Sequence, residues 1–201
     1  MLHAVDLFAG CGGLSLGFQN VGIEVRAAFE LWETAAHCYE QNFKHPVFRA
    51  DLSNTDTAMK LINPYKPDLI IGGPPCQDFS HAGKRIEASR ASLTGSFAAI
   101  ISTIKPPYFV MENVDRAEKS DAYALAREAF KEAGYGLTEV VLDASYCGVP
   151  QRRKRFFCIG IRNGKDDAVK DIITRRMSNK ETTLRDYFGD TFSFNYYYRH
   201  H

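Results

Sequence analysis

Short apolar runs alternate with longer stretches of helical character along most of this sequence. Such alternation is typical of a mostly parallel β-sheet that is covered on both faces by helices, so the predicted fold class is α/β. The runs that predict strands are His3–Phe8, Glu24–Phe29, Asp68–Gly72, Tyr108–Glu112, Leu137–Asp143 and Phe156–Ile161. Because the last two runs lie close together in the sequence, we expect them to pair as an irregular antiparallel hairpin at one edge of the sheet.

Helices are predicted between these strands. The segments are Leu14–Val21, Trp32–Asn42, Asp56–Ile62, Leu93–Ile104 and Asp121–Ala133. Gly134 follows the last of them in the position of a helix C-cap. From about Asn163 onward the pattern weakens into charged and polar sequence. A chain of 201 residues, 45% of them hydrophobic, suits one compact domain with its own core and is too short for two ordinary domains.

The composition argues against several classes of protein. Lysine and arginine number 25 against 24 aspartate and glutamate, so the net charge of +1 gives no global basic field for coating nucleic acid. An odd number of cysteines, 5, and the lack of a signal-like start favour reduced thiols and a cytoplasmic location. No apolar run approaches the roughly 18 residues that span a bilayer, so we expect no membrane partner. No cysteine or histidine pair has metal-ligand spacing, so we predict no metal site.

A glycine-rich run, DLFAGCGG at residues 6–13, follows the first predicted strand and opens a helix. Its three glycines allow a sharp turn and the close approach of a ligand. Glu30 ends the second strand about 20 residues downstream, where a carboxylate can accept hydrogen bonds from ribose hydroxyls. Asp51 follows the third apolar patch and suits an exocyclic amine. These features predict an adenosine-type cofactor, although a purely geometric turn and a dinucleotide oxidoreductase both remain open at this point.

A cysteine on a stiff backbone follows the strand that ends at residue 72. The segment is GGPPCQDFS at residues 72–80, in which two prolines fix two φ angles and hold the sulfur of Cys76 in a defined place. Glu112 ends the next strand along the chain. Arg153 and Arg155 alternate at the start of a later strand, so we expect them to point to one face. There they can present planar donors to a carbonyl oxygen and a phosphate.

Together these segments resemble the signature blocks of the cytosine carbon-5 DNA methyltransferases, a family that uses S-adenosylmethionine. Four blocks, at residues 6–18, 73–80, 112–114 and 151–155, occur in the order and with gaps similar to those of the family. The resemblance covers about Val5 to Ile161 and implies the Rossmann-like fold of S-adenosylmethionine-dependent methyltransferases. The cofactor-binding residues that it implies are Phe8, Gly10, Gly12, Glu30, Asp51, Leu52, Pro74 and Leu93, and the catalytic residues are Cys76, Glu112, Arg153 and Arg155.

The resemblance also implies a mechanism. The Cys76 thiolate adds to carbon 6 of cytosine, and the resulting enamine attacks the methyl sulfonium, which leaves S-adenosylhomocysteine as the product. A Glu112 carboxyl group with a pKa raised by burial quenches the charge at ring nitrogen 3, while Arg155, with Arg153 behind it, donates to the ring carbonyl. The substrate is double-stranded DNA with the cytosine flipped out of the stack, as in a restriction-modification system. The sequence does not name the base that removes the carbon-5 proton.

The end of the chain departs from the family pattern. Residues 1–162 are expected to form the catalytic domain, and residues 163–201 only the lead-in to a target-recognition domain. We therefore consider the catalytic subunit of a split enzyme, a truncated gene product and a decayed remnant. We favour the first, with a second polypeptide as partner, because the catalytic blocks through the arginines are intact. A non-catalytic S-adenosylmethionine-binding module and a transfer RNA cytosine methyltransferase are the alternative functions.

Overall fold

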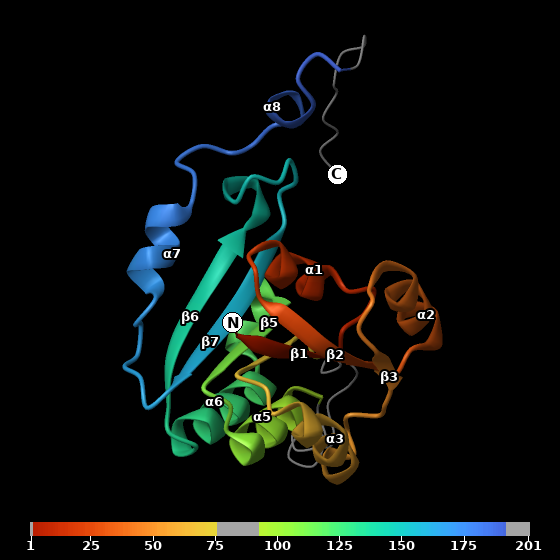
Figure 1. The fold of residues 1–201 in the computed structure, drawn as a ribbon. Helices are drawn as coiled ribbons and strands as arrows, with labels where there is room; N and C mark the ends of the chain where they lie inside the picture. Colours follow the sequence, from red (N-terminus) through yellow and green to blue (C-terminus); the bar gives the residue numbers. More distant parts are fainter. Residues whose placement is uncertain (1, 76–92, 192–201) are drawn as a thin grey trace, which may run out of the picture.

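Seven strands form one mixed sheet in the computed structural model, which describes residues 2–75 and 93–191 (Figure 1). Their bounds are β1 His3–Leu7, β2 Glu24–Glu30, β3 Val47–Arg49, β4 Leu69–Gly72, β5 Tyr108–Val114, β6 Tyr135–Asp143 and β7 Lys154–Arg162. The order across the sheet is β3-β2-β1-β4-β5-β7-β6. β7 runs antiparallel to β5 and to β6, and the remaining neighbours pair in parallel. The predicted parallel sheet with an antiparallel hairpin at one edge is confirmed. The expected irregularity of the hairpin is wrong, because β6 and β7 pair without a register shift.

Helices cover both faces of this sheet. Their bounds are α1 Gly13–Asn20, α2 Glu33–Asn42, α3 Thr55–Ile62, α5 Leu93–Ile104, α6 Asp121–Glu132, α7 Lys170–Arg176 and α8 Leu184–Phe188, and short 3₁₀ helices are η1 Asn63–Tyr65, η2 Asp115–Lys119 and η3 Ala144–Tyr146. In Figure 1, α3, α5 and α6 lie together on one face and α1 and α2 on the other. Gly134 follows α6 with a φ of +89°, as predicted for a C-cap glycine. None of the described helices is long and apolar enough to cross a membrane.

The chain changes its direction of travel across the sheet at β1. The first three strands progress from β1 toward β3, and the chain then returns so that β4 pairs with the other side of β1. In open α/β sheets such a switch point is where ligands bind, outside the carboxyl ends of the strands. The glycine-rich run follows β1, and the segment that leads to Cys76 follows β4. The fold therefore brings the two predicted parts of the site to one edge of the sheet.

Aromatic rings fill the core between the sheet and α5 and α6. Phe109 of β5 lies with its ring centroid 4.4 Å from Phe130 and 5.0 Å from Tyr135. Phe97 of α5 lies 6.2 Å from Phe109. All four side chains are almost completely buried, and each such ring contributes about 1.5–3 kcal/mol of transfer free energy. This packing fixes the position of β5, the strand that carries Glu112.

Gly160 of β7 leaves the space that the Phe109 ring occupies. A Cβ atom at position 160 would overlap this ring, which cannot retreat because Phe130 and Tyr135 pack against it. We expect Gly160→Ala to lower the free energy of unfolding by about 1–3 kcal/mol in urea denaturation. In α1, nothing lies within 4 Å of a Cβ added at Gly17, so Gly17→Ala should leave stability equal or higher. Equal stability of the two variants would contradict this account.

β3, α7 and α8 were not predicted from the sequence, and neither were the short 3₁₀ helices. β3 has only 3 residues, too few for an alternating pattern to be recognised. α7 and α8 have only 7 and 5 residues, too few for a helical period to be recognised, and neither contains a buried residue. α8 is instead stabilised locally by a capping box between Thr183 and Asp186.

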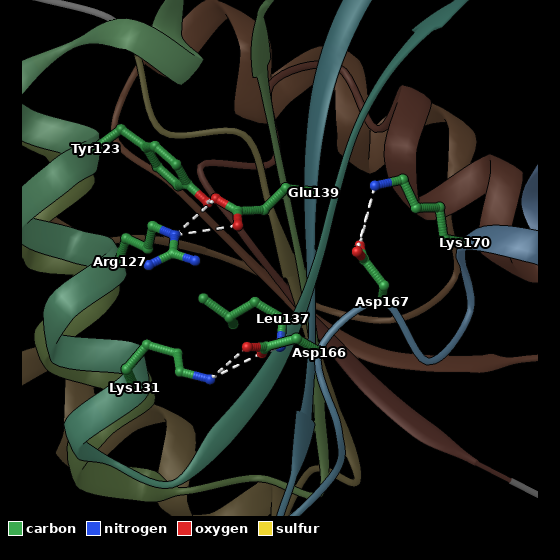
Figure 2. Close-up of polar contacts among 8 residues, drawn as sticks. All are labelled: Tyr123, Arg127, Lys131, Leu137, Glu139, Asp166, Asp167 and Lys170. Atoms are coloured by element: carbon green, nitrogen blue, oxygen red, sulfur yellow. Dashed lines mark hydrogen bonds and ion pairs between the residues drawn. The ribbon is translucent and has the colours of Figure 1, made fainter.

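The segment that follows β7 covers the outer edge of β6. The Asp167 N–H donates to the Leu137 carbonyl at 2.9 Å, and the Leu137 N–H donates to Asp166 Oδ1 at 2.8 Å. Lys131 of α6 donates to both oxygens of the same Asp166 carboxylate, at 2.8 and 3.0 Å (Figure 2). Because these contacts satisfy backbone groups of an edge strand, they protect it from pairing with another chain.

Candidate active site

The glycine-rich loop between β1 and α1 is a strained turn. Phe8, Gly10 and Gly12 all have positive φ angles, of 56°, 55° and 93°. For a residue with a Cβ, such as Phe8, this conformation costs of the order of 1–3 kcal/mol. At Gly12 a Cβ atom would collide with the ring of Phe43 and lie 2.9 Å from Tyr39 Cε2. The loop therefore needs glycine where it packs on α2, and surrounding contacts must maintain its shape.

Glu30 joins this loop to the end of β2. Its Oε2 atom accepts a hydrogen bond from the Gly10 N–H at 2.8 Å, and its Oε1 atom accepts one from the Trp32 N–H at 2.7 Å. Each carboxylate oxygen has a second lone pair, so the group can still accept hydrogen bonds from two hydroxyls. Sequence reasoning predicted Glu30 as a ribose ligand. The structure adds that Glu30 also ties the loop to the strand.

Asp51 lies at the same edge of the sheet as Glu30. Glu30 pairs in register with Arg49 of β3, and the Ala50 N–H donates to the Glu30 carbonyl at 3.2 Å. The exposed Asp51 carboxylate accepts a hydrogen bond from the Ser53 N–H at 2.9 Å, and hydrogen bonds from Ser53 lower its pKa. An ionised acceptor is therefore available there. Its neighbour Leu52 is 2% exposed and belongs to the hydrophobic core.

The segment that leads to Cys76 is held by the end of β5. The Asn113 Nδ2 group donates to the Pro74 carbonyl at 3.0 Å, and both residues are buried. A Cβ atom on Gly73 would lie 3.2 Å from Glu112 Oε2, so the Glu112 carboxyl group lies directly beside this backbone. Cys76 itself lies outside the described residues, which resume at Leu93, the first residue of α5.

Glu112 and Arg155 form an ion pair beside this segment. Arg155 Nε lies 3.0 Å from Glu112 Oε1, and the side chains are 24% and 27% exposed. Burial raises the pKa of the Glu112 carboxyl group, while the charges of Arg155 and Arg153 oppose this increase. Arg153 lies just before β7, which begins at Lys154. The turn before β7 leaves both arginine charges acting on Glu112.

Comparison with known proteins identifies the family of this chain. A family model described as C-5 cytosine-specific DNA methylase matches residues 2–201. The chain belongs to this family. The Type II methyltransferase M.HindV of Haemophilus influenzae is 52% identical over 200 residues, which cover 99% of this chain and 66% of that protein. M.HgiDI of Herpetosiphon aurantiacus is 50% identical and is covered over 65% of its length, so the chain spans about two thirds of these relatives.

A solved structure of a related methyltransferase has the same fold. The crystal structure of DNMT2 from Spodoptera frugiperda is similar with a TM-score of 0.71 at 26% identity, over 82% of this chain and 51% of that chain. The family and the Rossmann-like methyltransferase fold expected from the sequence are thereby confirmed. The family also implies chemistry that depends on S-adenosylmethionine.

The segment after α7 anchors the run that carries the arginines. Arg152 Nε donates to Glu181 Oε1 and Oε2 at 3.1 and 3.0 Å, and Arg152 Nη2 donates to Oε2 at 2.8 Å. The Thr182 N–H donates to the Ser145 carbonyl at 2.7 Å. Contacts with residues 181 and 182, which lie outside the β6–β7 hairpin, thus hold the segment that precedes β7. Sequence reasoning missed this contact because Arg152 and Glu181 lie far apart in the chain.

Two further polar residues of the candidate site were given no separate role from the sequence. Asn113 follows Glu112 in the third block, and its contact with Pro74 was not evident from spacing. Asp6, the first residue of the glycine-rich run, is completely buried, and burial raises its pKa to about 7. Within residues 2–75 and 93–191, no three histidine, cysteine, aspartate or glutamate side chains gather to hold a metal ion.

Proposed function

We propose that this chain is the catalytic part of an enzyme that transfers a methyl group from S-adenosylmethionine to carbon 5 of cytosine in double-stranded DNA. The observation that carries the proposal is the Glu112–Arg155 ion pair beside Gly73, at the sheet edge that also holds the glycine-rich loop and Glu30. Similarity to Type II methyltransferases supports a role in a restriction-modification system.

The residues at this edge fit S-adenosylmethionine. Gly10 and Gly12 present backbone without a Cβ, and the free lone pairs of Glu30 can accept from two ribose hydroxyls. The exposed Asp51 carboxylate suits the exocyclic amine of adenine. The remaining proposed wall residues are Phe8, Leu52, Pro74 and Leu93. When bound, the cofactor supplies an electrophilic methyl group and is released as S-adenosylhomocysteine.

The proposed chemistry begins at the sulfur of Cys76. Its thiolate forms a bond to carbon 6 of cytosine, and the electrons of the 5,6 double bond move to carbon 5 and, through the conjugated ring, to nitrogen 3. Glu112 donates a proton or a strong hydrogen bond to ring nitrogen 3, and the raised pKa of its carboxyl group favours the protonated form needed for this. Arg155, with Arg153 behind it, stabilises charge on the ring carbonyl oxygen. After carbon 5 has gained its methyl group, a base removes the carbon-5 proton, the 5,6 double bond re-forms and the bond from carbon 6 to the Cys76 sulfur breaks. Ring nitrogen 3 returns its proton to Glu112.

The DNA substrate requires more than this site. Because carbon 5 and carbon 6 lie within the base stack, the cytosine must be flipped into the active site. We propose residues 1–162 as the catalytic domain, residues 163–201 as the lead-in to target recognition, and a second polypeptide as a partner. The length of the curated relatives, of which the chain spans about two thirds, supports a further recognition region.

Transfer of a tritium-labelled methyl group tests the proposal. Duplex DNA and transfer RNA are offered separately to the chain alone and to the chain with proteins that co-purify from its source. We expect label on carbon 5 of cytosine in DNA, with full rate and sequence preference only in the co-purified sample. Label in transfer RNA would favour the RNA-modifying alternative. Cofactor binding without transfer to either substrate would favour a non-catalytic module.

The cofactor part of the proposal has its own variant pair. Glu30→Ala should weaken S-adenosylmethionine binding roughly tenfold or more, because hydrogen bonds to a charged group are lost. Glu33→Ala is the matched control, since Glu33 is an exposed residue in the first turn of α2 that pairs with Arg49 at 3.4 Å. Calorimetric titration measures both affinities. Equal affinities for the two variants would contradict the assignment of Glu30.

A further inference from the structure

A chain of buried hydrogen bonds connects β1 to α2 behind the glycine-rich loop. The Ser15 hydroxyl donates to Asp6 Oδ2 at 2.7 Å, and the Tyr39 hydroxyl donates to Ser15 Oγ at 2.6 Å. The Tyr39 oxygen also lies 2.6 Å from His45 Nε2. Because the Tyr39 proton is directed to Ser15, His45 must be the donor in this last contact. The chain thus has one direction, from His45 through Tyr39 and Ser15 to Asp6.

The burial of this chain is unusual for groups that do not take part in the chemistry. Asp6, Ser15 and Tyr39 are each 0% exposed. The second oxygen of Asp6, Oδ1, has no hydrogen-bond partner among the described residues. Burying a carboxyl group with an unsatisfied oxygen is costly, and such groups in native proteins call for a functional explanation. Ser15 lies in the first turns of α1, directly after the loop, so the chain acts on the loop from its helical end.

The ring of Tyr39 packs against the same loop. It stacks on Phe43 with ring centroids 4.3 Å apart. The two rings occupy the space that a Cβ atom of Gly12 would need. Tyr39 therefore contacts the loop through its ring and holds the helix after the loop through its hydroxyl group.

We propose that Tyr39 is a positioning residue for the cofactor, acting through Ser15 and Asp6 to maintain the strained conformation of residues 8–13. The part of this inference that concerns S-adenosylmethionine rests on the proposed function. In that conformation the Gly10 N–H donates a hydrogen bond to Glu30. The loop therefore fixes its own backbone and the Glu30 carboxylate together, and both belong to the proposed ribose site. Without this support the loop samples other conformations, and the apparent affinity falls with the fraction that is competent to bind.

A matched control separates this role from a general contribution to stability. Tyr135 is another buried tyrosine, and its hydroxyl group donates to the Pro106 carbonyl at 2.6 Å, away from the carboxyl ends of β1 and β2. Tyr39→Phe and Tyr135→Phe each remove one buried hydroxyl group and keep the ring. If Tyr39 acted only on stability, the two variants would affect the cofactor site alike.

The first measurement is cofactor affinity. Trp32 is the one tryptophan of the chain, and its N–H donates to Glu30, so its fluorescence reports on the proposed site. We expect Tyr39→Phe to raise the Kd for S-adenosylmethionine roughly five- to twentyfold, with kcat at saturating cofactor unchanged, and Tyr135→Phe to raise it less than about twofold. Equal Kd values for Tyr39→Phe and the unaltered chain, or equal increases in the two variants, would overturn the inference.

The second measurement needs no ligand. Hydrogen exchange of the amides of residues 9–13 should be faster in Tyr39→Phe than in Tyr135→Phe. Each variant is measured at the same interval below its own denaturation temperature, so that global stability is matched. Ser15→Ala should have the same effect, and the double variant with Tyr39→Phe should add little, because both changes interrupt one chain. Unchanged exchange in both single variants would overturn the positioning role. If exchange is faster in Tyr39→Phe but the unaltered chain binds no S-adenosylmethionine, the proposed function is refuted and the effect of Tyr39 on the loop still holds.

Discussion

Replacing Cys76 with alanine is expected to lower methyl transfer by a factor on the order of a thousand or more and to abolish covalent capture of DNA. A duplex that carries 5-fluorocytosine at the target cannot lose its carbon-5 substituent, so the enzyme should remain attached through the sulfur. The adduct is measured as a species that survives denaturing electrophoresis. We expect this large effect because the backbone that leads to Cys76 is held in place. Asn113 donates a hydrogen bond to Pro74, and Glu112 lies beside Gly73.

Three of the four other cysteines are poorly suited to be the nucleophile. Cys158 is completely buried, and burial raises the pKa of its thiol to about 12. Burial also raises the pKa of the Cys147 thiol, and a hydrogen bond with Cys38 raises that of Cys11. A raised pKa leaves little thiolate at neutral pH. Cys147→Ala is therefore the control that keeps full capture, and capture by Cys76→Ala at the unaltered yield would contradict the proposal.

The parts of the site that were predictable depend on local sequence. The glycine-rich loop follows from residue types that tolerate positive φ, and the position of Glu30 follows from the end of an apolar strand. β1 and β4 could be placed because each is a short, almost continuous run of buried residues. These local rules bring Gly10, Glu30 and Glu112 to one sheet edge without any knowledge of tertiary contacts.

The contacts that hold the site together could not be read in this way. The hydrogen bond from Asn113 to Pro74 spans 39 positions, and that from Tyr39 to Ser15 spans 24. Each depends on the order of strands and on how helices pack, which periodicity does not specify. The approach of Arg155 to Glu112 likewise requires the antiparallel register of β5 and β7, in which Val114 pairs with Arg155.

Glu112→Gln is expected to lower kcat by roughly two to four orders of magnitude, the usual contribution of a positioned proton donor. Glutamine keeps the size of the side chain and can still donate a hydrogen bond, but it cannot transfer a proton to ring nitrogen 3. The rate is measured at saturating S-adenosylmethionine and duplex DNA with the reconstituted enzyme. Glu118→Gln, on the exposed η2 segment nearby, is the control that should keep full activity.

The pH profile distinguishes a proton donor from a residue that only shapes the site. Burial raises the pKa of Glu112, and the reaction uses the protonated carboxyl group, so kcat should fall as the pH rises through this pKa. Arg155 opposes the increase, so Arg155→Gln should move the falling limb to higher pH, and Arg153→Gln should move it in the same direction by less. In Glu112→Gln this limb should be absent, because an amide does not titrate. A limb that persists unchanged in Glu112→Gln would assign the proton to another group.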